Sequence, residues 1–237
     1  EIYTLSLHDA LPILAFRIGD VCLTTNNIEF PDVVRGDTAT VRVEIMNDTQ
    51  EVYTPNLMHL PPYITATFTP QMLARNRRGY IDLTLHSDKL ISTGLTQTSI
   101  YLARYAGDKV GRANEIAVSA ILLPDASLFQ SELAHPLLEL STTTLELGKL
   151  GHKKKITGTL TISNRGNGLL RITSLQAFDS TLEISIPKRD ILPGETINMK
   201  VTLLAKYLRQ AKSQPRVLLI CNDPNHLKET ITVNYEK

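Results

Sequence analysis

The feature that most constrains the fold of this chain is an internal repeat with an offset of about 117 residues. Self-similarity on this scale indicates that one domain occurs twice. Four blocks, each with at least two apolar residues, recur in the same order: 28–30 with 145–147, 43–47 with 160–164, 81–85 with 199–203, and 116–118 with 231–233.

Apolar and polar residues alternate within these blocks. Val41, Val43 and Ile45 are separated by Arg42 and Glu44, and the segment 196–204 alternates in the same way. A period of two places the apolar residues on one face of a half-buried antiparallel strand. About seven short strands per copy, separated by turn residues, predict an all-β chain of two tandem immunoglobulin-like β-sandwich domains.

We expect the two sandwiches to cover residues 14–123 and 139–237, joined by a short, partly helical linker over 124–138. Asp125 is suited to cap a short helix in this linker, and Pro136 would stop it. Three large apolar linker residues are expected to pack at the domain junction: Leu128, Phe129 and Leu133.

The segment 1–13 has no repeat counterpart, no initiator Met and no basic start. It resembles the translated sequencing-adapter tail found at the ends of fragmentary metagenomic proteins. We therefore expect an artefactual or disordered tail that is dispensable for folding, with the natural N-terminus missing. A signal peptide would not be visible in such a fragment.

Turn residues follow the strand that ends at Asn164. The run 164–168 reads Asn-Arg-Gly-Asn-Gly and separates two apolar segments. We predict a hairpin here, with Gly168 in a positive-φ conformation that favours glycine.

Several of these motifs, in this order, resemble an uncharacterised bacterial envelope family, domain of unknown function 1573, whose members carry tandem immunoglobulin-like domains. They are Asn164-x-Gly166 followed by Leu170-x-Ile172, Leu-Pro-Gly-Glu at 192–195, and Ile-Cys-Asn-Asp-Pro at 220–224. In the first copy, Leu-Pro-Pro-Tyr-Ile at 60–64 is also similar. The resemblance implies export to the periplasm or cell envelope, and no known activity.

The chain departs from the family pattern in two places. A Cys-Gly-Cys-Thr segment, common in the family's first domain, is absent, and 75–79 reads Arg-Asn-Arg-Arg-Gly where the second copy has Pro-Gly-Glu.

Composition and motifs argue against several kinds of function. The net charge of +1 gives no overall field for nucleic acid, and the apolar runs are too short to span a bilayer. The six histidines form no metal-binding or catalytic motif, so no catalytic, cofactor-binding or metal-binding residue is assigned. Asp223, in the turn at 222–225, has too few acidic neighbours for a calcium loop.

Other chemically notable residues receive structural interpretations. Cys22 and Cys221 are expected to be buried free thiols with no neighbouring histidine. Glu44 and Glu183 are expected to face solvent from alternating strands.

Basic residues form two clusters, at 153–155 in a hairpin-like loop and at Arg75, Arg77 and Arg78. Both are expected to be solvated. Residues 1–138 carry a formal charge of −5 and residues 139–237 carry +6, which suggests two surfaces of opposite sign.

These observations predict a non-enzymatic structural module of a bacterial envelope protein, or one that binds a protein or glycan partner, with no nucleic acid, no cofactor and no integral membrane segment. One alternative is a periplasmic chaperone-like module that completes a partner's sheet by strand addition. The other is an enzyme with an interdomain site. An unpaired apolar edge strand would favour strand addition, and a deep pocket with histidines and carboxylates would favour an enzyme.

Overall fold

The computed structural model describes residues 14–129, 134–211 and 213–236. Strands account for 54% of the structure and helices for 6%, which confirms the all-β class. The predicted tail 1–13 and the predicted contact of Leu133 lie outside the described residues. In the part of the chain that the structure describes, no helix is long and apolar enough to cross a bilayer.

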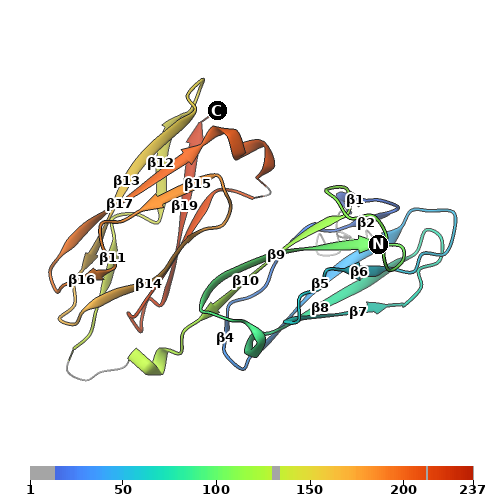
Figure 1. Cartoon of the computed structure of the whole chain (residues 1–237), viewed down its shortest axis with the longest axis horizontal. Coiled ribbons are helices and arrows are strands. Elements are labelled where there is room, and N and C mark those ends of the chain that lie inside the picture. The colour runs from blue at the N-terminus through green and yellow to red at the C-terminus, as the bar shows by residue number, and fades with distance from the viewer. Residues whose placement is uncertain (1–13, 130–133, 212, 237) are drawn as a thin grey trace, which may run out of the picture. The chain divides into compact units, whose positions relative to one another are not determined.

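The chain divides into two compact units, which are described separately (Figure 1). Unit 1 comprises the described residues up to Pro31, with Gly36–Lys89 and Gln97–Ala120. Unit 2 comprises Asp32–Arg35, Leu90–Thr96 and the described residues from Ile121 onward.

Two sheets form between residues 16 and 123. The first has the strand order β1-β2-β5-β8-β7, and the second has the order β3-β10-β9-β6, with β4 also paired to β10. Their strands are β1 (Phe16–Ile18), β2 (Val21–Leu23), β3 (Asn27–Glu29), β4 (Val33–Val34), β5 (Thr38–Asn47), β6 (Asn56–Met58), β7 (Ile64–Thr69), β8 (Arg78–His86), β9 (Gly94–Ala103) and β10 (Glu115–Leu123). A short 3-10 helix, η1 (Ser87–Lys89), follows β8.

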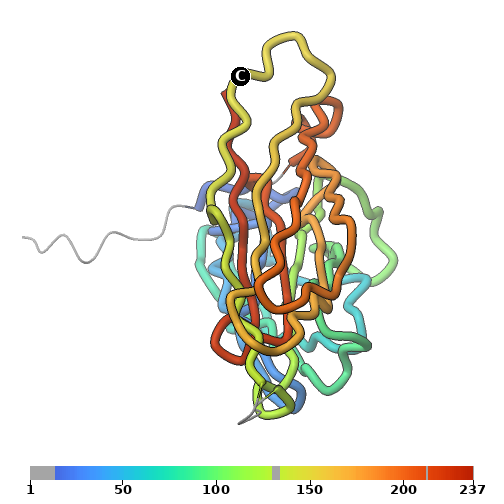
Figure 2. The backbone as a smooth tube through the Cα atoms, turned by 90° about the vertical axis from the view of Figure 1, so that its left-hand side faces the viewer, coloured from blue at the N-terminus to red at the C-terminus, as the bar shows by residue number. Residues whose placement is uncertain are grey.

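Two further sheets form between residues 138 and 236, with the orders β11-β13-β17-β15 and β12-β19-β18-β14-β16. A single buried cluster takes residues from both sheets, including Ile162, Met199, Val217 and Ile231, which makes this part a two-layer sandwich. Strands β12 and β19 run side by side (Figure 2). The elements are β11 (Leu138–Leu140), β12 (Thr144–Lys149), β13 (Lys155–Asn164), β14 (Leu170–Ala177), β15 (Leu182–Ser185), β16 (Asp190–Ile191), β17 (Thr196–Leu204), η3 (Ala205–Gln210), β18 (Arg216–Cys221) and β19 (Lys228–Glu236).

Residues that the sequence repeat aligns occupy matching register positions. The antiparallel pair β5–β8 corresponds to β13–β17, and the parallel pair β3–β10 corresponds to β12–β19. In each case, residues that the repeat aligns are paired with residues that the repeat also aligns. The corresponding Cα partners are Val43↔Ile81 and Leu160↔Met199, then Ile28↔Val118 and Leu145↔Val233.

The alternating blocks form strands with one buried face, as predicted. On β17, Ile197, Met199, Val201 and Leu203 are all buried. Glu44 is an exception to the predicted exposure. It is buried, and its carboxylate pairs with the Arg78 guanidinium at 2.8 Å, which compensates for the lost hydration.

The prediction of a hairpin at 164–168 is wrong, because β13 and β14 belong to different sheets. The segment turns from one sheet to the other, and the Asn164 amide holds this corner by donating to the carbonyls of Gly168 (2.7 Å) and Ile191 (2.9 Å). Gly168 has no positive φ. Its lack of a side chain instead allows the backbone of residues 134–135 to approach, since a Cβ would lie 3.0 Å from Ala134 and His135 atoms.

The predicted short helix after Asp125 is present as η2 (Ala126–Phe129). Asp125 accepts hydrogen bonds from the backbone and hydroxyl of Ser127, as a capping residue does. Leu128 is exposed rather than packed, with 75% of its surface accessible. Inside unit 2, a second apolar cluster contains Ile121, Phe178, Leu218 and Ile220.

Candidate functional site

The candidate site is the free edge of strand β7. This strand lies at the end of its sheet and pairs along its full length with β8, from Ile64↔Leu85 to Thr69↔Tyr80 (Figure 1). No other strand of the described chain pairs with its second side.

The register determines which backbone groups point away from the sheet. The His86 N–H donates to the Tyr63 carbonyl at 2.9 Å, so residue 63 and every second residue after it point toward β8. The N–H and C=O of Ala66 and Phe68 therefore point outward. The outward N–H of Ile64 is already used by the Pro61 carbonyl at 3.0 Å.

Strand β7 reads Ile-Thr-Ala-Thr-Phe-Thr over six residues without charge, glycine, proline or bulge. Natural edge strands normally avoid further pairing through charges, prolines, bulges or short length. Strand β7 has none of these features within its length, so it retains the capacity to accept another strand.

The other strands that end a described sheet carry such protection, although β9 (Gly94–Ala103) also has an uncharged stretch before residue 101 that β6 does not cover. Strand β12 has Glu146 and Lys149 with a register irregularity, β15 carries Glu183, and β1 carries Arg17 in an ion pair with Asp48. Each remaining edge has only two or three residues: β3, β4, β6, β11 and β16.

The two faces of β7 differ in polarity. Ile64 is buried and Ala66 and Phe68 are half-buried, whereas the threonines between them are exposed. The Thr65 hydroxyl lies 3.0 Å from the His86 ring nitrogen on β8. An added strand would therefore need one apolar face and one small polar face.

Prolines limit the length of this edge. Pro61 and Pro62 precede the strand and Pro70 follows it directly. Proline has no backbone N–H to donate, so the edge available for pairing is confined to about the length of β7.

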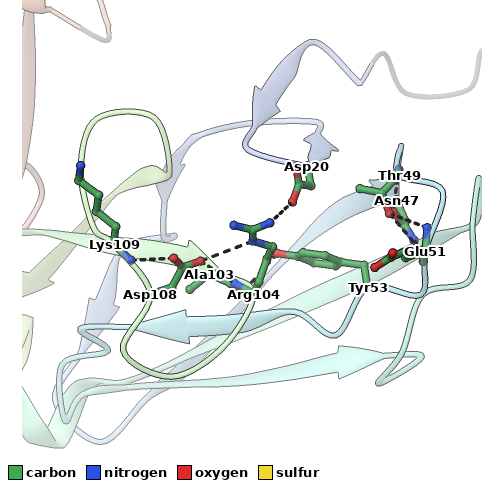
Figure 3. A network of polar contacts seen from close by, with 9 residues as sticks. All are labelled: Asp20, Asn47, Thr49, Glu51, Tyr53, Ala103, Arg104, Asp108 and Lys109. Atoms are coloured by element: carbon green, nitrogen blue, oxygen red, sulfur yellow. Dashed lines mark hydrogen bonds and ion pairs between the residues drawn. The ribbon is translucent and has the colours of Figure 1, made fainter.

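A separate cluster of polar residues lies around Tyr53 and Arg104 (Figure 3). The Tyr53 hydroxyl donates to the Ala103 carbonyl at 3.2 Å, and the Arg104 guanidinium reaches Asp20 at 3.2 Å and Asp108 at 3.8 Å. These residues line a cavity of about 400 Å³. Burial raises the pKa of Tyr53 still further above neutral pH. The polar groups bind each other and tie loops together, which indicates a structural role.

The predicted basic clusters have different environments. Arg78 is paired with Glu44, which neutralises part of the cluster formed by Arg75, Arg77 and Arg78. Residues 153–155 do not lie in a hairpin, since β12 and β13 belong to different sheets. The structure brings these lysines to Lys206 and Arg209, a convergence that the sequence does not show.

Both cysteines are free. Cys221 is buried and burial raises the pKa of its thiol to about 12, whereas Cys22 is only half-buried. The Cys221 Sγ lies 3.2 Å from the carbonyl oxygen of His226. This contact uses the backbone of His226 and not its ring, so it forms no catalytic pair.

Asp223 has a structural position. Its buried carboxylate accepts the N–H groups of Leu138 (2.8 Å) and Asn225 (3.0 Å) and lies 3.1 Å from the His226 ring. These contacts fix the turn after β18 to the start of β11. Among the described residues, no group of three or more His, Cys, Asp or Glu side chains is placed to hold a metal ion.

No motif in the sequence marks β7 as a binding edge. The signal present in the sequence is an uncharged run of seven residues, 63–69, between Pro-Pro and Pro, in which apolar residues alternate with threonine from Ile64 onward. Its position at a sheet edge depends on pairing with β8, which the run itself does not specify.

Residues 136–235 match a family model described as HYDIN/CFA65/VesB-like, Ig-like domain. This match supports an immunoglobulin-like fold for that part of the chain. The envelope family suggested by the turn motifs stays a prediction.

The chain also resembles solved structures. A crystal structure of a protein of unknown function from Porphyromonas gingivalis W83 matches with a TM-score of 0.69 at 20% identity, covering 92% of this chain and 100% of that one, and shows a shared fold. The E. coli chaperone DraB matches with a TM-score of 0.30 at 8% identity, covering 90% of this chain and 97% of that one. The sialic acid binding region of a Streptococcus sanguinis SK1 adhesin matches with a TM-score of 0.34 at 8% identity, covering 92% of this chain and 78% of that one. Both are too distant to inform fold or function. No curated protein matches the sequence.

Proposed function

We propose that this chain is a non-enzymatic binding module of a bacterial envelope protein, built of two immunoglobulin-like domains, which takes up an extended segment of a partner protein at the free edge of β7. The observation that carries this proposal is the unprotected six-residue edge of that strand. Main-chain hydrogen bonds supply affinity in strand addition, and side chains on alternate positions supply specificity.

Separate observations support the other parts of the proposal. The matching register of the aligned residues supports two domains, for which 14–123 and 139–237 remain the predicted limits. The envelope location rests on the motif resemblance alone. A non-enzymatic role agrees with the buried Cys221 thiol and with the structural use of Asp223.

A protein partner fits this edge better than a glycan. The outward groups of Ala66 and Phe68 alternate donors and acceptors at the spacing of a peptide backbone. A glycan has no matching array, whereas an extended peptide pairs with these groups regardless of most of its sequence.

The sequence of β7 itself fits the edge as a donor strand. In an antiparallel arrangement with Ala66 opposite Ala66, the apolar Ile64 and Phe68 lie opposite each other and Thr65 lies opposite Thr67. Cross-strand threonine pairs already occur in this fold, as between Thr40 and Thr84 at 2.9 Å. A peptide with the sequence of residues 63–69 is therefore a suitable probe.

The experiment titrates the full chain with this peptide and follows backbone amides by NMR and hydrogen exchange. We expect the Ala66 and Phe68 amides to become protected, because they gain hydrogen-bond acceptors. A peptide N-methylated at its own Ala66 should fail to bind, since that N–H pairs with the edge. The matched peptide methylated at Thr67 should bind, because that N–H points away.

Protein variants provide the complementary test. Ala66→Pro removes an outward N–H that β8 does not use and should abolish binding, while Ala66→Val keeps the N–H and should retain it. Equal binding of the two methylated peptides, or protection outside β7, would refute strand addition at this edge.

A further inference from the structure

One end of the second sandwich carries a concentrated positive charge in a concave site. The loop between β12 and β13 and the start of β13 supply three lysines, and η3 supplies Lys206 and Arg209. Together with His152, Leu204 and Ala205, they line a cavity of about 780 Å³. The lysines are Lys153, Lys154 and Lys155. Figure 2 shows the loop after β12 beside the C-terminal end of the chain.

Backbone pairing fixes the two segments against each other. Lys155 lies opposite Leu204 in the β13–β17 ladder, and the Ala205 N–H donates to the Lys154 carbonyl at 3.0 Å. The side chains are exposed, but their attachment points are held by this pairing. The cations therefore converge because of the fold and not because of their positions in the sequence, which are about 50 residues apart.

Among the described residues, no carboxylate lines this cavity. None of the ion pairs recorded between described residues involves the five cations, whereas other basic side chains of this sandwich, such as Arg171 with Asp190, are paired. The nearest partner of Lys206 is the Tyr207 ring, 4.4 Å from its Nζ, and Glu183 also attracts this ammonium group electrostatically. The local charge is therefore largely uncompensated within the described residues.

We propose that this cavity binds a group with several phosphoryl oxygens. Like charges held together repel, and a multiply charged anion relieves that repulsion while accepting several N–H donors at once. Lysine acts as a compact point charge for phosphate, and Arg209 adds a planar donor pair. The Tyr207 ring is occupied by Lys206, whose Nζ lies 4.4 Å from the ring centroid, and no other aromatic side chain of the described residues contacts these cations, which gives little surface for stacked bases.

The test titrates the full chain with sodium triphosphate by calorimetry and NMR. We expect saturable binding that weakens as salt increases, with shifts confined to residues lining the cavity. The variant Lys154→Gln/Lys206→Gln/Arg209→Gln should lose affinity by roughly tenfold or more, because three charge-assisted contacts are removed.

Arg75→Gln/Arg77→Gln is the matched control, since it removes charge from the other basic cluster and should leave affinity unchanged. Thermal melting checks that each variant is folded. No saturable binding, or an equal loss in both variants, would overturn the proposal.

A second arm distinguishes the source of the phosphoryl group. Sedimentation with phosphatidylcholine vesicles, with and without phosphatidylglycerol, detects binding to a lipid headgroup. Binding of triphosphate without vesicle binding supports a free phosphorylated ligand, and binding of anionic vesicles through the same residues supports a lipid. A single-stranded oligonucleotide that binds more tightly than triphosphate and is unaffected by the triple variant would contradict the proposed site. The peptide test at β7 uses a different surface, so either proposal can fail alone.

Discussion

At the scale of single residues, two buried asparagines perform the same task in the two copies. The Asn47 amide donates to the carbonyls of Glu51 (2.8 Å) and Leu73 (2.9 Å), and its Oδ1 accepts the Thr49 N–H at 2.9 Å. Asn164, its counterpart in the repeat, bonds to groups at the corresponding positions. An amide side chain suits this corner because it both donates and accepts.

Asn164→Ala should destabilise the chain by about 1–3 kcal/mol, because it leaves buried carbonyls without donors. Asn198→Ala is the matched control, since that asparagine is exposed on β17 and should change stability little. Urea unfolding of both variants provides the comparison. Equal stability of the two would contradict the assigned role of Asn164.

Asn76 takes the place of Gly194, which explains how the first copy forms this turn without Pro-Gly-Glu. Asn76 has φ of 53° and donates its N–H to the Asn47 carbonyl, and Gly194 has φ of 76° and donates to the Asn164 carbonyl. Asparagine is the non-glycine residue that best tolerates this left-handed conformation. The two turns thus share a backbone geometry despite their different sequences.

Asn76→Ala should therefore cost on the order of 1 kcal/mol, whereas Asn76→Gly should be neutral or slightly stabilising. The difference in melting temperature between these two variants measures the conformational effect directly. A more stable Ala variant would exclude a left-handed residue at this position.

The two thiols should also differ in reactivity. Cys221 is buried with its pKa raised to about 12, so it remains protonated at pH 8 and the reactive thiolate is scarce. Cys22 is half-buried. Labelling the native chain with a thiol reagent should modify Cys22 first, and denaturation should expose Cys221. Mass spectrometry of the labelled peptides identifies the order.

At the scale of elements, the corner between β13 and β14 depends on close backbone contact. A Cβ at Gly166 would lie 2.0 Å from the His135 carbonyl oxygen and 2.6 Å from the Leu137 nitrogen. The residues leading into β11 therefore pass directly over the corner. Backbone atoms cannot move aside as a flexible side chain can, so the requirement for glycine is steric here.

Gly166→Ala should destabilise the chain by about 1–3 kcal/mol through this overlap. Gly111→Ala is the control, because Gly111 has no positive φ and a Cβ there would meet no atom within 4 Å. Chemical unfolding should show a lower midpoint for the first variant only. A similar decrease for both variants would point to a general effect of glycine replacement.

At the scale of the whole molecule, the repeat predicts which N-terminal residues the fold requires. The aligned blocks start at residue 28, and the described strands begin with β1 at Phe16. A chain starting at Leu14 should therefore melt within about a few degrees of the full chain, a difference smaller than that of one typical core substitution. Calorimetry of both chains checks this, and loss of cooperative unfolding would show that the first thirteen residues are needed.

The sequence by itself determined the all-β class and the alternating strand faces, because strand periodicity and turn residues are local signals. It also identified residues 153–155 as basic, but it predicted a hairpin there and a positive φ at Gly168, both of which are wrong. Only the tertiary structure decided which strand lies at an edge and which cations share a cavity. Strand β7 is an edge because β8 is its only neighbour among the described strands, and Lys154 lines the same cavity as Lys206 because of the register between β13 and β17. Such pairings join residues far apart in the chain, and a local pattern is compatible with several of them until the sheets assemble.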